Sequence, residues 1–204
     1  MNTQAINTRG NIMSRNTARV IVPYRLLLTL ALVFAAELSV AETQIEVEFM
    51  QEKGSTNEWI HAKAHCLTPE RQLHEVLNAV VKYPVLHSWI KDTKPESNLI
   101  NGVRQFLVEF RFPWPVGKQW SRVEVKKEAD STISWHQLEG TLKMNRGSIV
   151  ITERNQQTLL DYRAIIDVGY PNTFTRGYKK KFVLEFLRAI DKETVKIGAK
   201  GSLS

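Results

Sequence analysis

The stretch YKKKFVLEFLRAI, residues 178–190, carries large apolar side chains at the spacing of an α-helix. Tyr178, Phe182, Phe186 and Ile190 follow one another at intervals of four residues. Because four residues make slightly more than one helical turn, these side chains form one stripe along the helix. An amphipathic helix of this kind must bury its stripe against another layer. The rest of the chain should therefore supply a surface with one apolar face.

Residues 43–167 supply such a surface, because most of this region alternates apolar and polar residues. Residues 43–50 and 58–67 alternate in this way, and from residue 97 onward further alternating segments follow one another. This period of two is typical of half-buried strands, and short turns between consecutive strands predict an antiparallel meander. The predicted turns are Asn101-Gly102, Pro113–Val116, Ala129-Asp130, Asn145–Gly147 and Asn155-Gln156.

One helix is predicted between the second and third strands. Thr68 is predicted to cap the N-terminus of this helix, with Pro69 at the first helical position and Glu70 in the first turn. Pro84 should end or kink this helix, and a short helix or turn over residues 85–90 follows. The order of elements predicts an α+β fold in which a curved antiparallel sheet wraps around the long C-terminal helix.

The N-terminal residues have the pattern of a secretory signal peptide. Basic residues precede an apolar run of 11 residues at 26–36, and Ser39 and Ala41 occupy the small-residue positions of a cleavage site. The run is shorter than the roughly 20 residues of a membrane span. We therefore expect a signal peptide over 1–41, a mature domain over 42–204, and a periplasmic or secreted location. An uncleaved signal anchor is the alternative, and either Met1 or Met13 is a suitable start.

The charge of residues 42–204 argues against nucleic acid as a partner. The whole chain has a formal charge of +7, but residues 42–204 hold 24 basic and 20 acidic residues, or +4. Lys179, Lys180 and Lys181 fan around the helix, whereas Arg176, Lys179 and Lys180 share a side. We predict a solvated helix face there, with an anionic lipid surface as the alternative. Cys66 is the only cysteine in the sequence, and we predict that its thiol is buried in the core.

The order of elements, together with several short motifs, resembles the START-like (SRPBCC) superfamily, whose fold is called helix-grip. The resemblance runs from residue 61 to Ile190 and includes a small-residue strand, the Pro69 helix start and the turn that bears Trp89. QTLLDYRAIIDVG (157–169) resembles the strand that leads into the last helix. Pro113-Trp114-Pro115-Val116 resembles a turn of bacterial members, although Lys118-Gln119-Trp120 replaces the Arg-Asp pair that usually follows. The resemblance implies an elongated cavity for apolar molecules, and some members of the superfamily are aromatase/cyclases.

The sequence predicts no metal site, no cofactor and no catalytic group. His61 and His65 lie on one strand, where four residues span about 13 Å, which is too far for two ligands of one zinc ion. His136 with Glu139, or Glu109 with Arg111, could act as acid and base only if they faced a cavity. The alternation of the strands places Glu109 and Arg111 on the outer face instead.

The aromatic residues give the main functional signal, because they converge if the sheet wraps the helix. The leading hypothesis is non-covalent binding of a hydrophobic small molecule or lipid by a monomer, with transient membrane contact left open. A cyclase or dehydratase that uses His136, Glu109 or Tyr162, or an envelope protein-interaction module, are the alternatives. The strand pattern does not decide whether Trp120 or Trp135 points inward. The predicted cavity-lining residues are Trp89, Phe106, Phe110, Trp114, Trp120, Trp135, Tyr162, Ile166, Tyr178, Phe182 and Phe186.

Overall fold

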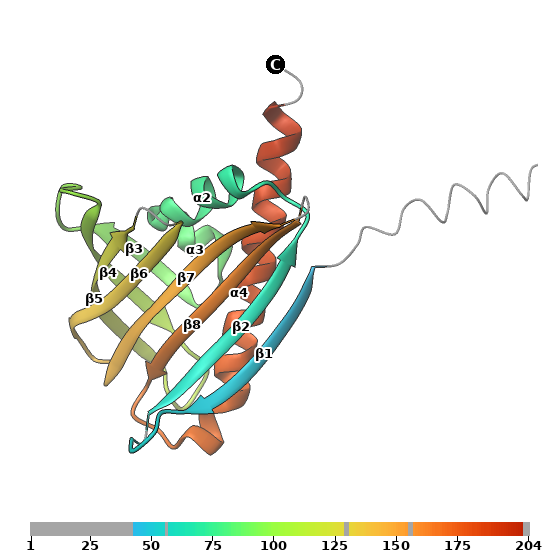
Figure 1. Ribbon diagram of the computed structural model, residues 1–204. Coiled ribbons are helices and arrows are strands. Elements are labelled where there is room, and N and C mark those ends of the chain that lie inside the picture. Colours follow the sequence, from blue (N-terminus) through green and yellow to red (C-terminus); the bar gives the residue numbers. More distant parts are fainter. Residues whose placement is uncertain (1–42, 56, 129–130, 155–156, 202–204) are drawn as a thin grey trace, which may run out of the picture. The chain divides into compact units, whose positions relative to one another are not determined.

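A computed structural model describes residues 43–55, 57–128, 131–154 and 157–201, and its strands form one eight-stranded antiparallel sheet (Figure 1). The strands are β1 (Gln44–Gln51), β2 (Glu58–Cys66), β3 (Ile90–Pro95), β4 (Val103–Arg111), β5 (Lys118–Lys127), β6 (Thr132–Gly140), β7 (Met144–Arg154) and β8 (Gln157–Asp167). The helical elements are α2 (Glu70–Asn78), the 3₁₀ turn η1 (Val80–Lys82), α3 (Tyr83–Leu86) and α4 (Asn172–Gly201).

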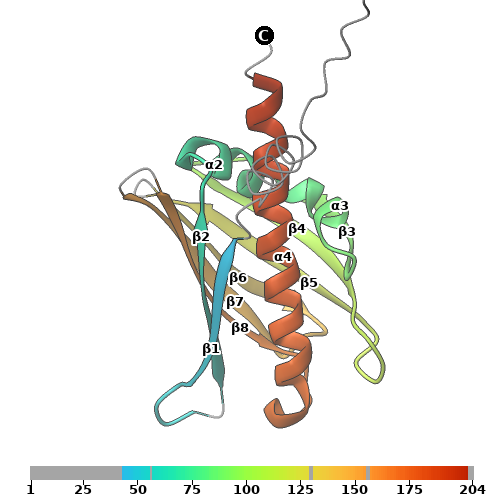
Figure 2. The same ribbon diagram turned by 90° about the vertical axis from the view of Figure 1, so that its right-hand side faces the viewer.

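The sheet confirms the predicted meander. Its strand order is β1-β2-β8-β7-β6-β5-β4-β3, so that consecutive strands pair from β3 to β8. The first hairpin, β1 and β2, then joins the last strand, because β2 pairs with β8. Figure 2 shows α4 lying across the open side of the curved sheet. This arrangement is the α+β helix-grip fold that the sequence predicts.

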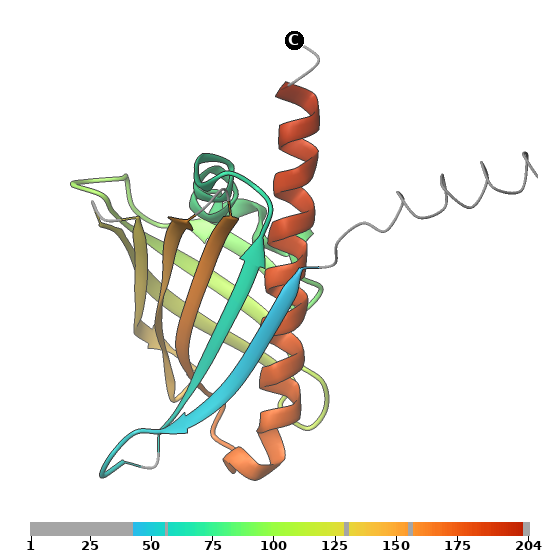
Figure 3. The ribbon, with the colours of Figure 1, turned by 45° about the vertical axis from the view of Figure 1, so that its right-hand side comes forward.

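The apolar stripe of α4 is buried against the sheet, as its spacing predicts. Val183, Leu187 and Ile190 are completely buried, and Phe182 and Phe186 are nearly so. Packing against α2, α3, β1 and β2 holds the helix at one side of the sheet (Figure 3). Each fully buried Val, Leu or Ile side chain contributes about 1.5–3 kcal/mol, so this stripe is a main source of stability.

The inner and outer faces of the sheet follow the predicted alternation. Phe106, Val108 and Phe110 are buried on β4, whereas Glu109 and Arg111 between and after them are exposed. Cys66 is buried, and burial together with the nearby Asp191 carboxylate raises the pKa of its thiol to about 12. The thiol is therefore protonated at neutral pH and does not act as a nucleophile.

The predicted ends of the first helix were wrong. Thr68 is buried and does not cap α2; Pro69 occupies the cap position without a side-chain hydrogen bond. The helix ends at Asn78, because Ala79 leaves the helical conformation. Pro84 lies in the first turn of α3, where the missing N–H of proline costs no hydrogen bond.

The predicted turn at Asn145–Gly147 was also wrong, because these residues lie inside β7. The chain turns earlier, after Gly140 at the end of β6. Gly147 serves a different purpose: a Cβ atom there would lie 2.5 Å from the ring of Trp135 and 2.4 Å from the backbone oxygen of Arg163. The glycine thus leaves space for an inward-facing tryptophan on the neighbouring strand. The Asn101-Gly102 and Pro113–Val116 turns are confirmed. The predicted turns at Ala129-Asp130 and Asn155-Gln156 lie outside the described residues.

Substitution Gly147→Ala should destabilise the protein by about 3 kcal/mol, because the new methyl group would overlap a backbone oxygen that cannot move alone. Urea denaturation followed by circular dichroism measures this change. Gly177→Ala is the matched control: nothing lies within 4 Å of a Cβ atom there, and alanine favours the exposed helix. Equal stability of the two variants would contradict the proposed role of Gly147.

Candidate ligand-binding cavity

An apolar cavity of about 100 Å³ lies between α4 and the concave face of the sheet. Six of the predicted residues line it, and their contact with a ligand stays a prediction. They are Phe110, Trp135, Tyr162, Ile166, Phe182 and Phe186. The other lining residues come from η1, α3 and the inner faces of β3 to β7 together with Phe112. These are Val80, Tyr83, Ile90, Val108, Phe112, Val123, Val125, Ile133, Asn145 and Ile149.

Three predicted residues lie close to the cavity but do not line it. Trp89 and Tyr178 belong to an aromatic cluster at one end, in which the Trp89 ring centroid lies 6.1 Å from that of Phe182 and 6.5 Å from that of Tyr178. Phe106 is buried in the core farther along β4. These three residues therefore lie outside the lining of the main cavity, although Tyr178 lines a smaller chamber beside it, and their contact with a ligand stays a prediction.

Trp114 does not line the cavity either, because it stands on the surface with 88% of its side chain exposed. Its turn lies next to the start of α4, where the Tyr170 hydroxyl donates to the Pro115 backbone oxygen at 3.3 Å. Phe174 on α4 is half exposed, with its ring centroid 6.3 Å from that of Tyr170. The turn and the helix start thus form an exposed aromatic surface beside the cavity.

The structure distinguishes the two tryptophans whose direction the sequence leaves open. Trp135 points inward, where its ring lies 5.7 Å from that of Tyr162 and its Nε1 donates to Asn145 Oδ1 at 3.0 Å. Trp120 points outward, since it alternates with the buried Ser121 and Val123. The position of Val123 and Val125 on the other face of the same strand is the signal that could have decided this.

A chain of hydrogen bonds holds the polar groups at the Trp135 end of the cavity. Asn145 Nδ2 donates to Ser121 Oγ at 3.5 Å, and Ser121 Oγ donates to Gln137 Oε1 at 3.0 Å. Gln137 Nε2 in turn donates to the backbone oxygen of Leu142 at 2.8 Å. Since buried polar groups are costly without partners, this chain fixes the ring of Trp135 in one orientation.

Two tyrosine hydroxyls add polarity to the cavity without adding charge. Tyr83 on α3 donates to the Leu77 backbone oxygen at 2.6 Å. Burial raises the pKa of the Tyr83 phenol, and burial together with Tyr83 raises the pKa of the Tyr162 phenol. Both phenols are therefore protonated at neutral pH and can serve as hydrogen-bonding groups.

His87 is a buried histidine that the sequence analysis did not single out. Its Nδ1 accepts a hydrogen bond from the Trp89 backbone N–H at 3.0 Å, and its Nε2 lies 3.2 Å from the Phe182 backbone oxygen. Because a carbonyl oxygen can only accept, Nε2 must carry the hydrogen and the ring is neutral. Its burial lowers the pKa of His87, against the opposing effects of Glu185 and the Phe182 carbonyl.

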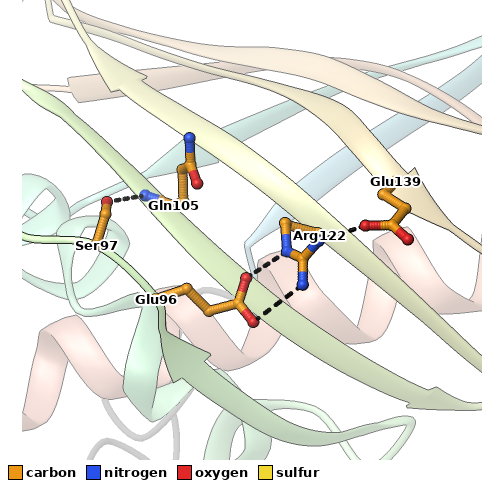
Figure 4. A network of polar contacts seen from close by, with 5 residues as sticks. All are labelled: Glu96, Ser97, Gln105, Arg122 and Glu139. Carbon is orange, nitrogen blue, oxygen red and sulfur yellow. Dashed lines mark hydrogen bonds and ion pairs between the residues drawn. The ribbon is translucent and has the colours of Figure 1, made fainter.

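The acid and base candidates on the sheet lie on its outer face. Glu139 forms an ion pair with Arg122, which also binds Glu96, as Figure 4 shows. His136 is exposed, and its Nε2 lies 3.9 Å from Glu124 Oε1. Of the three groups considered for catalysis, only Tyr162 faces the cavity.

The outer face also carries an open hollow of about 450 Å³ that includes Glu109, Arg111, Lys118 and Trp120. It is wider than the inner cavity but open to solvent and lined largely by charged side chains. The prediction that Trp120 lines the internal cavity was therefore wrong.

The described residues contain no cluster of three or more His, Cys, Asp or Glu suited to a metal ion. None of their helices is long and apolar enough to cross a membrane.

Acid should destabilise the protein through His87, because the unfolded chain takes up a proton on this residue that the folded protein excludes. Between the usual histidine pKa of about 6.5 and the lower pKa of the folded state, stability should fall as the pH falls, by up to about 1.4 kcal/mol per pH unit. Urea denaturation between pH 7.5 and pH 5 measures this slope. His87→Gln can retain both hydrogen bonds and should flatten the slope.

His65→Gln is the control for this experiment, because His65 is exposed on the outer face. It should leave the slope as it is in the parent protein. A slope that survives in the His87→Gln variant would show that other groups cause the acid sensitivity.

Comparison with known proteins supports the fold. No family model and no curated protein matches the sequence. Among solved structures, human STARD10 is similar with a TM-score of 0.64 at 13% identity, over 83% of this chain and 80% of that chain. A STAR-related lipid transfer protein from Xanthomonas axonopodis matches with a TM-score of 0.61 at 12% identity, over 74% of this chain and 93% of that one.

A third similar structure is the ZhuI aromatase/cyclase from Streptomyces sp. R1128. Its TM-score is 0.60 at 13% identity, over 68% of this chain and 93% of that chain. A lipid transfer protein and an aromatase/cyclase thus share this architecture, and identities this low establish the fold alone. The chain has the START-like (SRPBCC) fold, as the sequence motifs predict.

Proposed function

We propose that this protein binds a small hydrophobic or amphipathic molecule non-covalently in the cavity between α4 and the sheet. The observation that carries the proposal is a cavity lined almost entirely by apolar side chains, between the helix and the sheet. Enclosed apolar spaces with a few polar groups are typical of small-molecule sites. The similar lipid transfer protein from Xanthomonas axonopodis, by its name, gives the proposal further support.

The size of the cavity restricts the ligand. Its volume of about 100 Å³ is below the roughly 300–1,000 Å³ of pockets that enclose drug-sized molecules. The structure therefore represents a closed form, and a ligand larger than a small ring or short alkyl chain would have to displace lining side chains. Trp135 is fixed by hydrogen bonds, whereas Phe182 and Phe186 are held by packing alone and are the side chains that we expect to move.

The entrance in this proposal lies between the Pro113–Val116 turn and the start of α4. The contact between Tyr170 and Pro115 joins these two segments, and separating them would open the space beneath. The exposed ring of Trp114 suits transient contact with a membrane interface, where tryptophan is enriched. We expect the protein to act there as a monomer.

A catalytic role has less support from the positions of the titratable groups. Glu109 and His136 lie on the outer face, so a cyclase or dehydratase in this cavity would have to rely on Tyr162. The high pKa of its phenol suits a hydrogen-bond donor better than a base. The exposed outer face of the sheet remains a candidate for a protein partner, but no specific contact favours one.

Filling the cavity should weaken binding. Val123→Phe adds an aromatic ring inside the space, and we expect it to weaken binding of the uncharged fluorophore N-phenyl-1-naphthylamine at least about tenfold. Fluorescence titration measures the affinity. Leu138→Phe makes the same kind of change at an exposed position and should leave the affinity unchanged. Equal binding by both variants, or no binding by the parent protein, would contradict the proposal.

We further propose a periplasmic or secreted location, on the strength of the apolar run at residues 26–36. Residues 1–42 lie outside the described residues, so the signal peptide rests on the sequence. Intact mass measurement of the protein from its producing cells should give a chain that begins at Glu42. A mass that includes residues 26–36 would instead favour the signal anchor.

A further inference from the structure

A lysine is buried beside the cavity at the start of α4. Lys179 has only 6% of its surface exposed, contrary to the sequence prediction that it shares a solvated face with Arg176 and Lys180. It stands in one row with Thr175, Val183 and Leu187, spaced four residues apart, and every member of this row is buried. The helix therefore carries a cation on its inward side.

Lys179 borders a small chamber that adjoins the main cavity. This chamber, with a volume of about 20 Å³, has room for one water-sized group. Phe112, Ile166 and Phe182 line both spaces, so the two spaces share these walls. Among the described residues that line either space, Lys179 alone carries a charge.

The ammonium group of Lys179 lacks a close counter-ion in the part of the chain that the structure describes. Its Nζ donates to the neutral amide oxygen of Asn172 at 2.8 Å, and no carboxylate of a described residue lies within 4 Å of it. Glu58, which like Asp167 acts on Lys179 through its negative charge, is paired with Arg176 at 2.7 Å. Asp167 accepts a hydrogen bond from the Gly169 backbone N–H.

The balance of these effects leaves the ammonium group under-compensated. Burial lowers the pKa of Lys179, Arg176 acts in the same direction, and the opposing effects of Glu58 and Asp167 do not restore it. A buried cation without an ion-pair partner is energetically costly, and an anion that reaches it removes much of this penalty. The adjoining cavity is the space from which such an anion could come.

We propose that the ligand is a monocarboxylate with an apolar body, whose carboxylate accepts hydrogen bonds from Lys179 while the body fills the main cavity. This inference rests on the proposed function and adds the chemical class and orientation of the ligand. One carboxylate oxygen reaches the small chamber near the Pro113–Val116 turn, and the apolar body passes Phe112, Ile166 and Phe182. Lys179 is then the residue that distinguishes an acid from the corresponding alcohol.

Isothermal titration calorimetry at pH 7 with octanoate and 1-octanol tests the inference. The parent protein should bind octanoate at least about tenfold more tightly than 1-octanol. Lys179→Met should abolish this preference and retain binding of 1-octanol, Lys179→Arg should keep the preference, and Lys180→Met, at an exposed neighbour, should change neither affinity. A second pair, 2-naphthoate and 2-naphthol, repeats the test with an aromatic body. A preference for the acid in either pair, lost in Lys179→Met, supports the inference.

The failures of the two proposals are distinguishable. Equal affinity for acid and alcohol in both pairs, or a preference that survives Lys179→Met, overturns the role of Lys179 and leaves the binding function in place. Absence of binding of all four compounds to the parent protein overturns the binding function itself.

A measurement on the parent protein covers the case in which the Lys179→Met variant does not fold. The NMR signal of octanoate labelled with ¹³C at the carboxyl carbon reports the pKa of the bound acid. Beside Lys179, this pKa should be lower than that of free octanoate. A raised pKa of the bound acid would place the carboxyl group in apolar surroundings away from the lysine and overturn the inference.

Discussion

The packing of α4 against one side of the sheet is the interaction on which the rest of the structure depends. Val183, Leu187 and Ile190 are fully buried, and the helix packs closely on α2, α3, β1 and β2. A straight helix cannot follow the whole surface of a curved sheet, so it diverges from the strands on the other side. The large rings of Phe182 and Phe186 occupy much of the space that results. The cavity is therefore a geometric consequence of how the helix is anchored.

The same space has to satisfy two opposing demands. Burial of aromatic rings stabilises the domain, and a well-filled core leaves no room for a ligand. In the closed form the balance favours packing, since the cavity is small. The side chains around it are not equally fixed: Trp135 and Asn145 belong to a hydrogen-bonded chain, whereas the phenylalanines of α4 have only dispersion and apolar contacts. Ligand entry should therefore move the helix side of the cavity and leave the sheet side in place.

Burial of a polar side chain costs stability, and His87 and Lys179 are two buried polar side chains of this protein. His87 is neutral and hydrogen-bonded at both ring nitrogens, which fits a structural role beneath the aromatic cluster. Lys179 differs, because its hydrogen-bond partner among the described residues is a neutral amide, although the group is charged over most of the pH range. A structural histidine after α3 and an under-compensated lysine on α4 thus have different physical explanations, and only the second suggests a ligand.

Several features of the fold were predictable because they depend on local periodicity. The stripe of α4, the alternation on β4 and the inward position of Tyr162 all follow from which residues share a face, and the structure has them so. The candidate site was predicted only in part. Six lining residues lie where the pattern puts them, whereas Trp114 is exposed and Trp120 faces outward, because aromatic character does not reveal direction in a turn or near a bulge. Asn145 and Gly147 have the composition of a turn but serve to hold Trp135 in its place.

The sequence by itself determined the order of elements, the two faces of the sheet and the apolar stripe of the last helix, since each is a relation between residues close together in the chain. Only the tertiary structure decided how far the helix stands from the sheet, which rings enclose the cavity and that Lys179 is buried. These depend on segments more than a hundred residues apart, such as Glu58 and Arg176, which pair only when the chain has folded. Burial and charge compensation are properties of that assembled neighbourhood, and no local pattern encodes them.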